Sequence, residues 1–382
     1  MNIDANKDDF ETEIQFLEHF TSPFPTDRLI DNFRPKNLLL QWHITNQCNL
    51  RCLHCYQKEY NSSEDLSGTQ LQGILDQYIQ LLTLWGIKGH INITGGEPLM
   101  NKHLFTLLEN IHLHKHLCGF AILSNGTYMT HDIAKHLKEL GCAFFQISME
   151  GNQATHDKIR GEGNQEKCIK ALEILKKHKI QTMVSFTSSK LNVDSFDEVV
   201  KFCKNNGVNV LWTDRYIPMG NGKEISKELL QPTEVEAFFA KMYQWHHKLK
   251  RNWFTKTELR MHRALNFLTT EKQGCNCYRP YKCSAGRTLL TIMPNGDLVP
   301  CRRMPIILGN LLKDNLEELY QNSLLLKMLR KNNYAYPGCE KCKHWDVCNG
   351  GLRCLSYAYY GNPFIADPQC FKIHSTLPNI KQ

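Results

Sequence analysis

Three cysteines, Cys48, Cys52 and Cys55, constrain this chain more than any other feature of its sequence. Their C-x3-C-x2-C spacing follows a run of strand-forming residues at positions 38–45, so they are expected on a loop that leaves the end of a strand. Three thiolates can hold three irons of a 4Fe-4S cube and leave the fourth iron open, whereas four cysteines close a cluster for electron transfer. A zinc knuckle that lacks its fourth ligand, or a chance spacing, is the alternative interpretation.

Strands and helices are expected to alternate from residue 38 to residue 216. Apolar residues recur on one helical face between Leu71 and Leu82, and similar stretches separate six short runs of strand formers. The expected strands cover residues 38–45, 90–94, 120–124, 143–149, 182–187 and 208–216, and the expected helices cover 71–82, 102–115, 132–140, 165–179 and 195–206. This alternation predicts an α/β fold with a parallel sheet, in which ligands bind at the carboxyl ends of the strands.

The segment CNLRCLHCY at 48–56, followed by Gly95-Gly96-Glu97-Pro98 after the next expected strand, resembles the radical S-adenosylmethionine (SAM) enzymes. The resemblance runs from about residue 38 to about residue 219 and implies a partial (β/α)6 TIM-like barrel. It also implies an open 4Fe-4S cluster on the three cysteines. In that family Glu97 would accept the SAM ammonium group, and the two glycines would allow close backbone approach.

The same resemblance implies further SAM contacts. Tyr56 is expected near the adenine, Ser148 at the ribose and Arg160 at the SAM carboxylate, although a strand-end serine is often only a cap and a loop arginine is often a surface charge. The predicted cofactor-binding set is Tyr56, Gly95, Gly96, Glu97, Pro98, Ser124, Asn125, Ser148 and Arg160. Glu150, Asp214 and Arg215, at the ends of expected strands, are candidate catalytic residues that could bind substrate or take a proton.

Nine cysteines crowd into residues 275–370. Among them, residues 288–293 and 298–302 flank Pro-Asn-Gly-Asp, which predicts a hairpin with its turn at Asn295-Gly296. The spacings C-x12-G-x4-C and C-x2-C-x5-C resemble the SPASM domain, which carries auxiliary 4Fe-4S clusters in radical SAM enzymes. Leu352 stands where that family usually has a cysteine, and two four-cysteine zinc sites are the alternative.

The SPASM resemblance assigns ligands to two auxiliary clusters. The first would use Cys277, Cys283, Cys301 and Cys354, and the second Cys339, Cys342, Cys348 and Cys370. Cys275 competes with Cys277, and Cys354 would have to substitute from two residues beyond the family position. With the open cluster, the expected cofactors are SAM and three 4Fe-4S clusters. The other cysteines, Cys118, Cys142, Cys168 and Cys203, are expected to be buried structural thiols.

The resemblances together imply a domain order and an activity. An arm at 1–37 would precede the barrel at 38–219, a helical linker at 220–274 and the SPASM domain at 275–382. The enzyme would cleave SAM reductively to a 5′-deoxyadenosyl radical and abstract hydrogen from a residue of a ribosomally made peptide, leading to a thioether or carbon–carbon crosslink. A sulfatase-maturase-like protein oxidase, a small-molecule radical SAM enzyme, and a non-catalytic iron–sulfur or zinc-binding protein are the alternatives.

Composition limits the partners and the compartment. Sixteen cysteines without a secretory signal favour metal binding in the reducing cytoplasm over disulfides. No apolar run of membrane-spanning length is present, and the net charge of +8 falls once anionic clusters are counted, so neither a membrane nor a nucleic acid is an expected partner. The expected partners are a peptide or protein substrate, a separate leader-binding protein, and an electron donor such as flavodoxin or ferredoxin.

Overall fold

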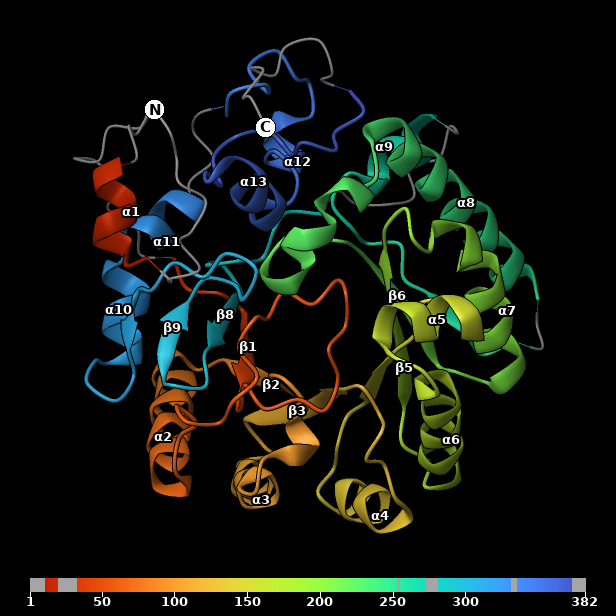
Figure 1. Ribbon diagram of the computed structural model, residues 1–382. Coiled ribbons are helices and arrows are strands. Elements are labelled where there is room, and N and C mark those ends of the chain that lie inside the picture. Colours follow the sequence, from red (N-terminus) through yellow and green to blue (C-terminus); the bar gives the residue numbers. More distant parts are fainter. Residues whose placement is uncertain (1–10, 20–32, 253–254, 273–280, 331–334, 373–382) are drawn as a thin grey trace. The chain divides into compact units, whose positions relative to one another are not determined.

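The computed structural model describes residues 11–19, 33–252, 255–272, 281–330 and 335–372 (Figure 1). The chain divides into two compact units that interleave along the sequence. The first consists of Met1–Gln47, Gln57–Gly119 and Ser284–Tyr334, and the second of Cys48–Tyr56, Phe120–Cys283 and Ala335–Gln382. Each unit is described by itself below.

The first unit is built on strands in the order β10-β9-β8-β1-β2. Strand β1 (Asn37–His43) is parallel to β2 (Lys88–Thr94) and to β8 (Leu289–Ile292), while β9 (Asp297–Val299) and β10 (Gly309–Asn310) continue antiparallel. Helix α2 (Gly68–Trp85) connects β1 to β2 and contacts both α3 (Leu104–Leu113) and α10 (Leu316–Asn322). Helices α1 (Glu13–His19) and α11 (Leu324–Arg330) and the 3-10 helix η2 (Pro98–Met100) complete the described elements of this unit.

Helix α2 shows why the sequence folds this way locally. Ser67 accepts a hydrogen bond from the Gln70 backbone while Gln70 reaches back, which forms a capping box, and Gly86 ends the helix with a positive φ of 63°. The apolar face expected from the sequence is buried (Leu71, Ile74, Leu75, Tyr78, Ile79 and Leu82). The helix therefore has its start, its stop and its packing face encoded locally.

The second unit contains parallel strands in the order β3-β4-β5-β6-β7. They are β3 (Cys118–Ser124, whose first two residues belong to the first unit), β4 (Phe145–Ser148), β5 (Thr182–Ser188), β6 (Val210–Arg215) and β7 (Glu258–Leu259). The helices are α4 (His131–Glu139), α5 (Gln153–Arg160), α6 (Asn164–Lys177), α7 (Phe196–Asn206), α8 (Pro232–Arg251), α9 (Asn266–Lys272), α12 (Trp345–Cys348) and α13 (Arg353–Tyr360), with 3-10 turns η3 (Val193–Ser195) and η4 (Gly220–Glu228).

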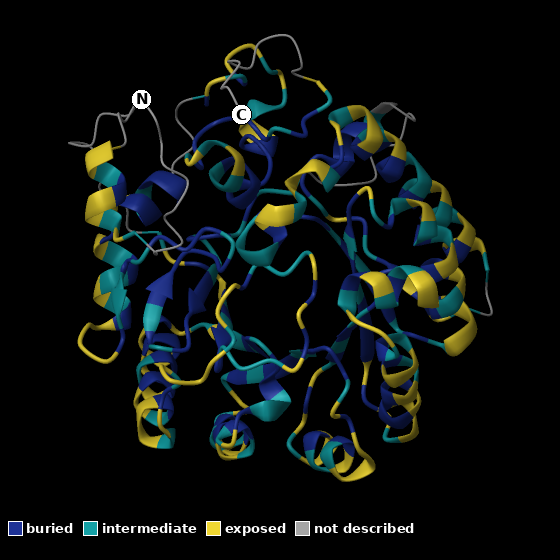
Figure 2. Ribbon diagram, viewed as in Figure 1, coloured by how far each residue is buried: buried dark blue, intermediate teal, exposed yellow. Residues whose placement is uncertain are grey.

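Burial follows the layers of each unit. Strand residues such as Phe145, Val184 and Leu211 are buried, whereas the helices expose their outer faces (Figure 2). Helix α6 contacts β4 and β5, and α7 contacts β6, so the helices cover the sheet of their own unit. Among the described residues, the helices are too short or too polar to cross a bilayer.

The fold is the predicted mixed α/β fold with a parallel sheet, and it is consistent with a partial (β/α)6 barrel. The hairpin between β8 and β9 is confirmed, with Gly296 at a φ of 89° where the Asn-Gly turn requires it. The sequence prediction missed α5, and it therefore placed Arg160 on a loop, whereas Arg160 is the last residue of that helix. The predicted division into arm, barrel, linker and SPASM domain stays a prediction.

Candidate active site and cluster-binding cysteines

The loop of Cys48, Cys52 and Cys55 belongs to the second unit and is held there by backbone hydrogen bonds. Leu53 N–H donates to the Ile159 carbonyl at the end of α5 (2.9 Å), and Gly222 N–H in η4 donates to the Cys55 carbonyl (2.9 Å). Cys52 is buried, and Cys48 and Cys55 are half-buried. Irregular backbone in this loop is therefore fixed by two neighbouring elements, and it presents three thiols without regular structure of its own.

Asn125, at the end of β3, reaches the same loop. Its amide Nδ2 donates to Asn49 Oδ1 (2.9 Å) and lies 4.0 Å from Cys48 Sγ, while its Oδ1 accepts from the backbone and hydroxyl of Thr127. The neighbouring Ser124 hydroxyl accepts from Gly126 N–H (2.9 Å). Both residues were predicted to bind the cofactor, and the structure places Asn125 beside the first cysteine.

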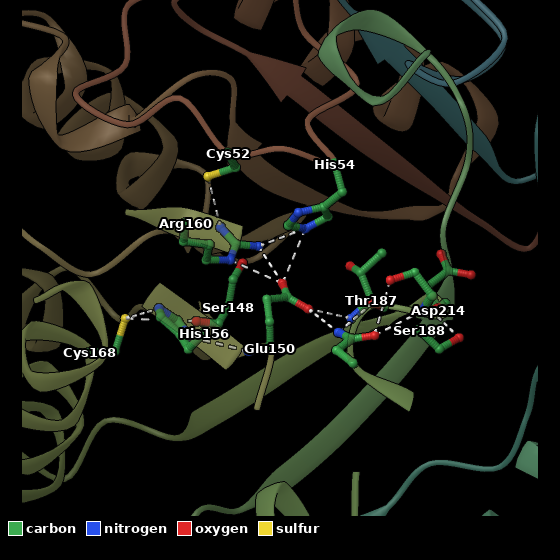
Figure 3. Close-up of polar contacts among 12 residues, drawn as sticks. Cys52, His54, Ser148, Glu150, His156, Arg160, Cys168, Thr187, Ser188 and Asp214 are labelled. Atoms are coloured by element: carbon green, nitrogen blue, oxygen red, sulfur yellow. Dashed lines mark hydrogen bonds and ion pairs between the residues drawn. The ribbon is translucent and has the colours of Figure 1, made fainter. Parts of the chain in front are cut away.

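A buried network joins Cys52 to the end of β4 (Figure 3). Arg160 donates through Nη2 (2.6 Å) and Nε (3.0 Å) to Glu150 Oε1, and its Nη1 lies 3.7 Å from Cys52 Sγ. His54, two residues beyond Cys52, places Nε2 3.2 Å from the same carboxylate oxygen. The predicted SAM-carboxylate ligand Arg160 is thus oriented by a carboxylate that also contacts the cluster loop.

The other oxygen of Glu150 is held as well. Oε2 accepts hydrogen bonds from Thr187 N–H (3.0 Å) and from Asn192 Nδ2 (3.3 Å), and the Glu150 side chain has no exposed surface. Burial alone would raise the pKa of Glu150, but Arg160 and His54 oppose it and hold the pKa well below its usual range. The carboxylate is therefore ionised at neutral pH, and its geometry favours orientation of Arg160, while its predicted catalytic role stays a prediction.

The Gly95-Gly96-Glu97-Pro98 segment lies in the first unit, directly after β2. Gly96 N–H donates to the Thr45 carbonyl and Glu97 N–H to the Gln47 carbonyl, both at 2.8 Å. A Cβ on Gly95 would overlap the Thr45 carbonyl oxygen, and one on Gly96 the Gln47 carbonyl oxygen. The two glycines are therefore required by close approach to the backbone that ends at Gln47, which directly precedes Cys48 in the sequence.

Glu97 is fully buried and caps the turn that follows it. Its Oε1 accepts from Leu99 N–H (3.1 Å), and Pro98 begins η2. In the second unit, Ser148 ends β4 and is half-buried, and Tyr56 is half-buried at the end of the cluster loop. The roles of all four residues toward SAM stay predictions.

Four of the C-terminal cysteines line one small cavity in the second unit: Cys339, Cys342, Cys348 and Cys370. Burial raises the pKa of Cys339 and Cys370 to about 12 and that of Cys348 to about 11, and neighbouring thiols of the same set contribute to each shift. These are four thiols that share one enclosed space, which is the donor set of a closed 4Fe-4S cluster. The residues present therefore fit the predicted second auxiliary cluster.

The zinc alternative needs a different geometry. Tetrahedral zinc requires its ligand atoms to converge within about 2.3 Å of one ion. Zinc would need the four sulfur atoms to converge on one ion, whereas a 4Fe-4S cube takes one cysteine at each iron, so the iron and zinc content of the protein separates the two interpretations.

The first auxiliary set is divided between the units. Cys283 and Cys354 belong to the second unit and Cys301 to the first, and all three are buried. Cys277, and its competitor Cys275, lie outside the described residues. Cys354 sits on α13 and is not a lining residue of the four-cysteine cavity. Its assignment to a separate cluster stays a prediction.

Arg215 and Asp214, at the end of β6, were predicted to be catalytic. Arg215 forms two hydrogen bonds to Asp367 (3.0 and 2.6 Å) and one to Gln369 Oε1 (2.9 Å), and it is 3% exposed. Asp214 Oδ1 accepts from Arg215 N–H (3.0 Å), and the two line a small cavity with Leu352. Through these contacts Arg215 holds the segment that leads to Cys370 in place at the end of β6.

Three residues of this arrangement were not predicted from the sequence. His54 and Asn192 contact Glu150, and Asp367 holds Arg215. His54 could have been considered because it lies inside the cluster loop, and Asp367 because it lies three residues before Cys370. Nothing in the sequence pattern marks Asn192.

Comparison with known proteins accounts for this arrangement. A model of the Radical SAM superfamily matches residues 42–204, and a model of the iron–sulfur cluster-binding domain SPASM matches residues 283–343, together more than half of the chain. The mycofactocin maturase MftC of Mycolicibacterium smegmatis is 27% identical over 362 residues, covering 92% of this chain and 87% of that protein. An AdoMet-dependent heme synthase of Methanosarcina barkeri is 23% identical over 351 residues, covering 87% of this chain and 95% of that protein.

Two solved structures have the same fold. Streptococcus suis SuiB bound to its precursor peptide SuiA superposes with a TM-score of 0.71 at 17% identity, over 89% of this chain and 77% of SuiB. The protein anSMEcpe with bound AdoMet superposes with a TM-score of 0.69 at 20% identity, over 88% of this chain and 91% of that chain. The two family models identify the chain as a member of the radical SAM superfamily, a radical SAM enzyme with a C-terminal iron–sulfur cluster-binding SPASM domain.

Proposed function

We propose that this enzyme modifies a ribosomally made peptide, abstracting hydrogen from one of its residues and leading to a thioether or carbon–carbon crosslink or a related change. The observation that carries the proposal is the four-cysteine cavity of the C-terminal part, which offers the donor set of an auxiliary cluster in addition to the predicted SAM-binding loop. Support also comes from the relatives named mycofactocin maturase, which align over 90–93% of this chain, and from a structural neighbour bound to a precursor peptide.

Cofactor content follows from the cysteine sets. Three 4Fe-4S clusters are proposed: an open one on Cys48, Cys52 and Cys55, and two closed auxiliary clusters on the sets predicted from the SPASM spacing. With an open iron, the first cluster supplies reductive cleavage of SAM when SAM is bound. The second auxiliary set has the direct support of a shared cavity, whereas the first rests on spacing alone.

The chain's own residues would orient SAM and exclude water. Glu97 is proposed to accept the SAM ammonium group, and its burial leaves the carboxylate in a low-dielectric setting where a charged hydrogen bond is strong. Arg160 is proposed to face the SAM carboxylate, supported by an Nη1 directed at Cys52 and by a side chain that keeps 12% exposure. Glu150 and His54 would fix that guanidinium in place.

Partners and compartment complete the proposal. An external one-electron donor such as flavodoxin or ferredoxin is proposed to reduce the open cluster, because each reductive cleavage of SAM consumes one electron. A separate leader-binding protein is proposed to present the peptide. Thiolate ligands need reducing surroundings, which favours the cytoplasm.

Anaerobic reconstitution with iron and sulfide tests the chemistry first. The protein with SAM and dithionite should form 5′-deoxyadenosine, and Cys48→Ala/Cys52→Ala/Cys55→Ala should abolish it while keeping about eight irons from two closed clusters. A triple variant that still forms 5′-deoxyadenosine would contradict the assignment of the open cluster. Near-stoichiometric zinc with little iron would contradict the cofactor content.

Peptide and small-molecule substrates can then be separated. A peptide encoded beside the gene should lose hydrogen by mass spectrometry, and deuterium placed at its modified carbon should appear in 5′-deoxyadenosine. The second candidate, action on a small molecule, is favoured by the heme-synthase relatives at 23% identity. Deuterium transfer from a labelled tetrapyrrole, with no change in the peptide, would establish that alternative.

A further inference from the structure

Arg353, the first residue of α13, carries a buried positive charge beside the four-cysteine cavity. It is 2% exposed. Its Nη1 donates to the Pro363 carbonyl (2.5 Å), and its guanidinium carbon lies 4.5 Å from the centroid of the Tyr336 ring. Within the ranges that the structure describes, Nε and Nη2 have no acceptor, and the guanidinium forms no ion pair with a carboxylate.

A buried guanidinium without an ion-pair partner lowers the stability of the folded state unless an anion lies next to it. A guanidinium stays charged at all accessible pH values, and an uncompensated buried ion costs several kcal/mol. The other buried arginine of this part of the chain shows the usual solution, because Arg215 is paired with both oxygens of Asp367. Asp367 is therefore already neutralised, and Arg353 needs another anionic partner.

The unpaired Nη2 lies next to a segment that borders the four-cysteine cavity. Gly350 has a φ of 75°, and a Cβ added there would overlap Arg353 Nη2. Gly350 also lines the cavity of Cys339, Cys342, Cys348 and Cys370. Nη2 thus abuts the short loop segment that borders the cavity, and glycine at position 350 leaves room for it.

The aromatic neighbours of Arg353 agree with this placement. The Tyr336 ring, which lies under the Arg353 guanidinium, also packs edge-on against Trp345 with ring centroids 4.6 Å apart. Trp345 is another lining residue of the cavity, so a second contact connects the guanidinium to the cavity wall.

We propose that Arg353 is the charge-compensating positioning residue of the auxiliary iron–sulfur cluster held by Cys339, Cys342, Cys348 and Cys370. A 4Fe-4S cluster with four thiolates carries a net charge of about −2, which matches the anion that Arg353 lacks. A nearby cation and N–H donors to cluster sulfur both raise the reduction potential. This inference rests on the proposed cofactor content. It assigns to Arg353 the role of raising the reduction potential of this cluster.

The test is an anaerobic redox titration of the reconstituted full-length holoenzyme, followed by electron paramagnetic resonance. The signal that disappears in Cys370→Ala identifies the cluster in question. Arg353→Met keeps the apolar stem and removes the charge, and Arg353→Lys keeps the charge. The matched control is Arg330→Met, because Arg330 is also buried, lies 3.8 Å from the Tyr320 ring and donates to the Gly286 and Tyr320 carbonyls.

Arg353→Met should move the midpoint potential of this cluster to a lower value, or selectively lose its irons, while Arg353→Lys restores most of the parent behaviour and Arg330→Met leaves the potential unchanged. A potential and iron content in Arg353→Met identical to the parent would overturn the inference, and so would equal iron loss in the Met and Lys variants. Parent protein with intact Arg353 that binds no auxiliary cluster would instead overturn the proposed cofactor content on which the inference rests.

Discussion

Arg215 and Asp367 form a bidentate ion pair between residues 152 positions apart in the sequence. The pair joins the end of β6 to the segment that carries Cys370, and both side chains are almost completely buried. Asp367 also accepts from Leu352 N–H (2.9 Å) and Gln369 N–H (3.0 Å), and its carbonyl accepts from Cys370 N–H (2.9 Å). The carboxylate therefore fixes the strand end and two loops that flank the cysteine cavity.

Asp367→Ala should destabilise the enzyme strongly, because it leaves the Arg215 guanidinium buried without its anion. Removal of one partner from a buried pair costs about 3–5 kcal/mol. The free energy of unfolding by guanidinium chloride, together with iron content, measures the effect, and the irons of the second auxiliary cluster should be lost first. Lys343→Ala is the control, since it breaks an exposed ion pair with Glu271 and should change little. Equal stability of the Asp367 and Lys343 variants would contradict this role.

Glu150→Gln should impair SAM cleavage while iron content is retained. The substitution keeps the shape of the side chain but removes the charge that holds Arg160 and His54 next to Cys52. Loss of a partner that orients a ligand residue typically costs about 10–100-fold in affinity or activity. The rate of 5′-deoxyadenosine formation and the affinity for SAM are the measurements. Exposed Glu139→Gln on α4 is the control, and a fully active Glu150→Gln enzyme would show that the network is dispensable.

His156 should make stability depend on pH between about 6.5 and 4. Burial lowers the pKa of His156 to about 4, and Nδ1 accepts from Glu150 N–H (3.2 Å), so the folded state holds the neutral ring. Between these pKa values the unfolded chain binds the extra proton, so stability is full above pH 6.5 and falls as pH decreases toward 4, by about 3 kcal/mol in total. Denaturant unfolding of the cluster-free protein at several pH values measures this. In His156→Gln the free energy of unfolding should change less between pH 6.5 and pH 4 than it does in the parent protein. The same pH dependence in both proteins would contradict this prediction.

Gly96→Ala should disturb the SAM-binding segment without affecting the rest of the fold. The added Cβ would overlap the Gln47 carbonyl oxygen, which is backbone and cannot move aside as a flexible side chain could. Glu97 N–H would then lose its hydrogen bond to the same carbonyl. Weaker SAM binding by calorimetry is expected. In contrast, Gly73→Ala on α2 adds a Cβ into open space and should stabilise that helix by about 0.5–1 kcal/mol; similar SAM affinity in both variants would disprove the steric argument.

Much of the fold could be predicted because its signals are local. The apolar face and the caps of α2, the Asn295-Gly296 turn and the strand ahead of Cys48 are each encoded within a few residues. Helix α5 was missed because its eight residues bury only His156 and Ile159, which is too weak a periodicity to recognise. Its only clear local signal is Asn152, whose side chain caps the helix by accepting from Thr155 N–H (3.0 Å).

The residues expected to bind the clusters and SAM could be predicted from the sequence, but the residues that hold them in place could not. Cysteine spacing and the Gly-Gly-Glu-Pro motif are sequence patterns, so Cys52 and Glu97 could be named in advance. The ion pair of Arg215 depends on a residue 152 positions away, and the charge of Arg353 is informative only once its burial is known. Tertiary packing decides both, and a single sequence carries no record of it.

Cys354 is the predicted cluster ligand that departs from the family's cysteine spacing, and one substitution tests its assignment. The thiol is buried on α13, one residue after Arg353 and two after Leu352, which occupies the family's usual ligand position. If Cys354 closes the first auxiliary cluster, Cys354→Ala should lose up to about four irons or change the spectrum of that centre. Cys142→Ala is the matched control, because Cys142 is also a buried thiol whose pKa burial raises to about 12 and whose Sγ donates to the Phe144 carbonyl (3.2 Å). The opposite outcome is that Cys354→Ala keeps full iron content, an unchanged auxiliary signal and full activity. The first auxiliary cluster would then have an open iron. Such an iron could bind a substrate thiolate directly, which would favour thioether formation on a cysteine-bearing peptide.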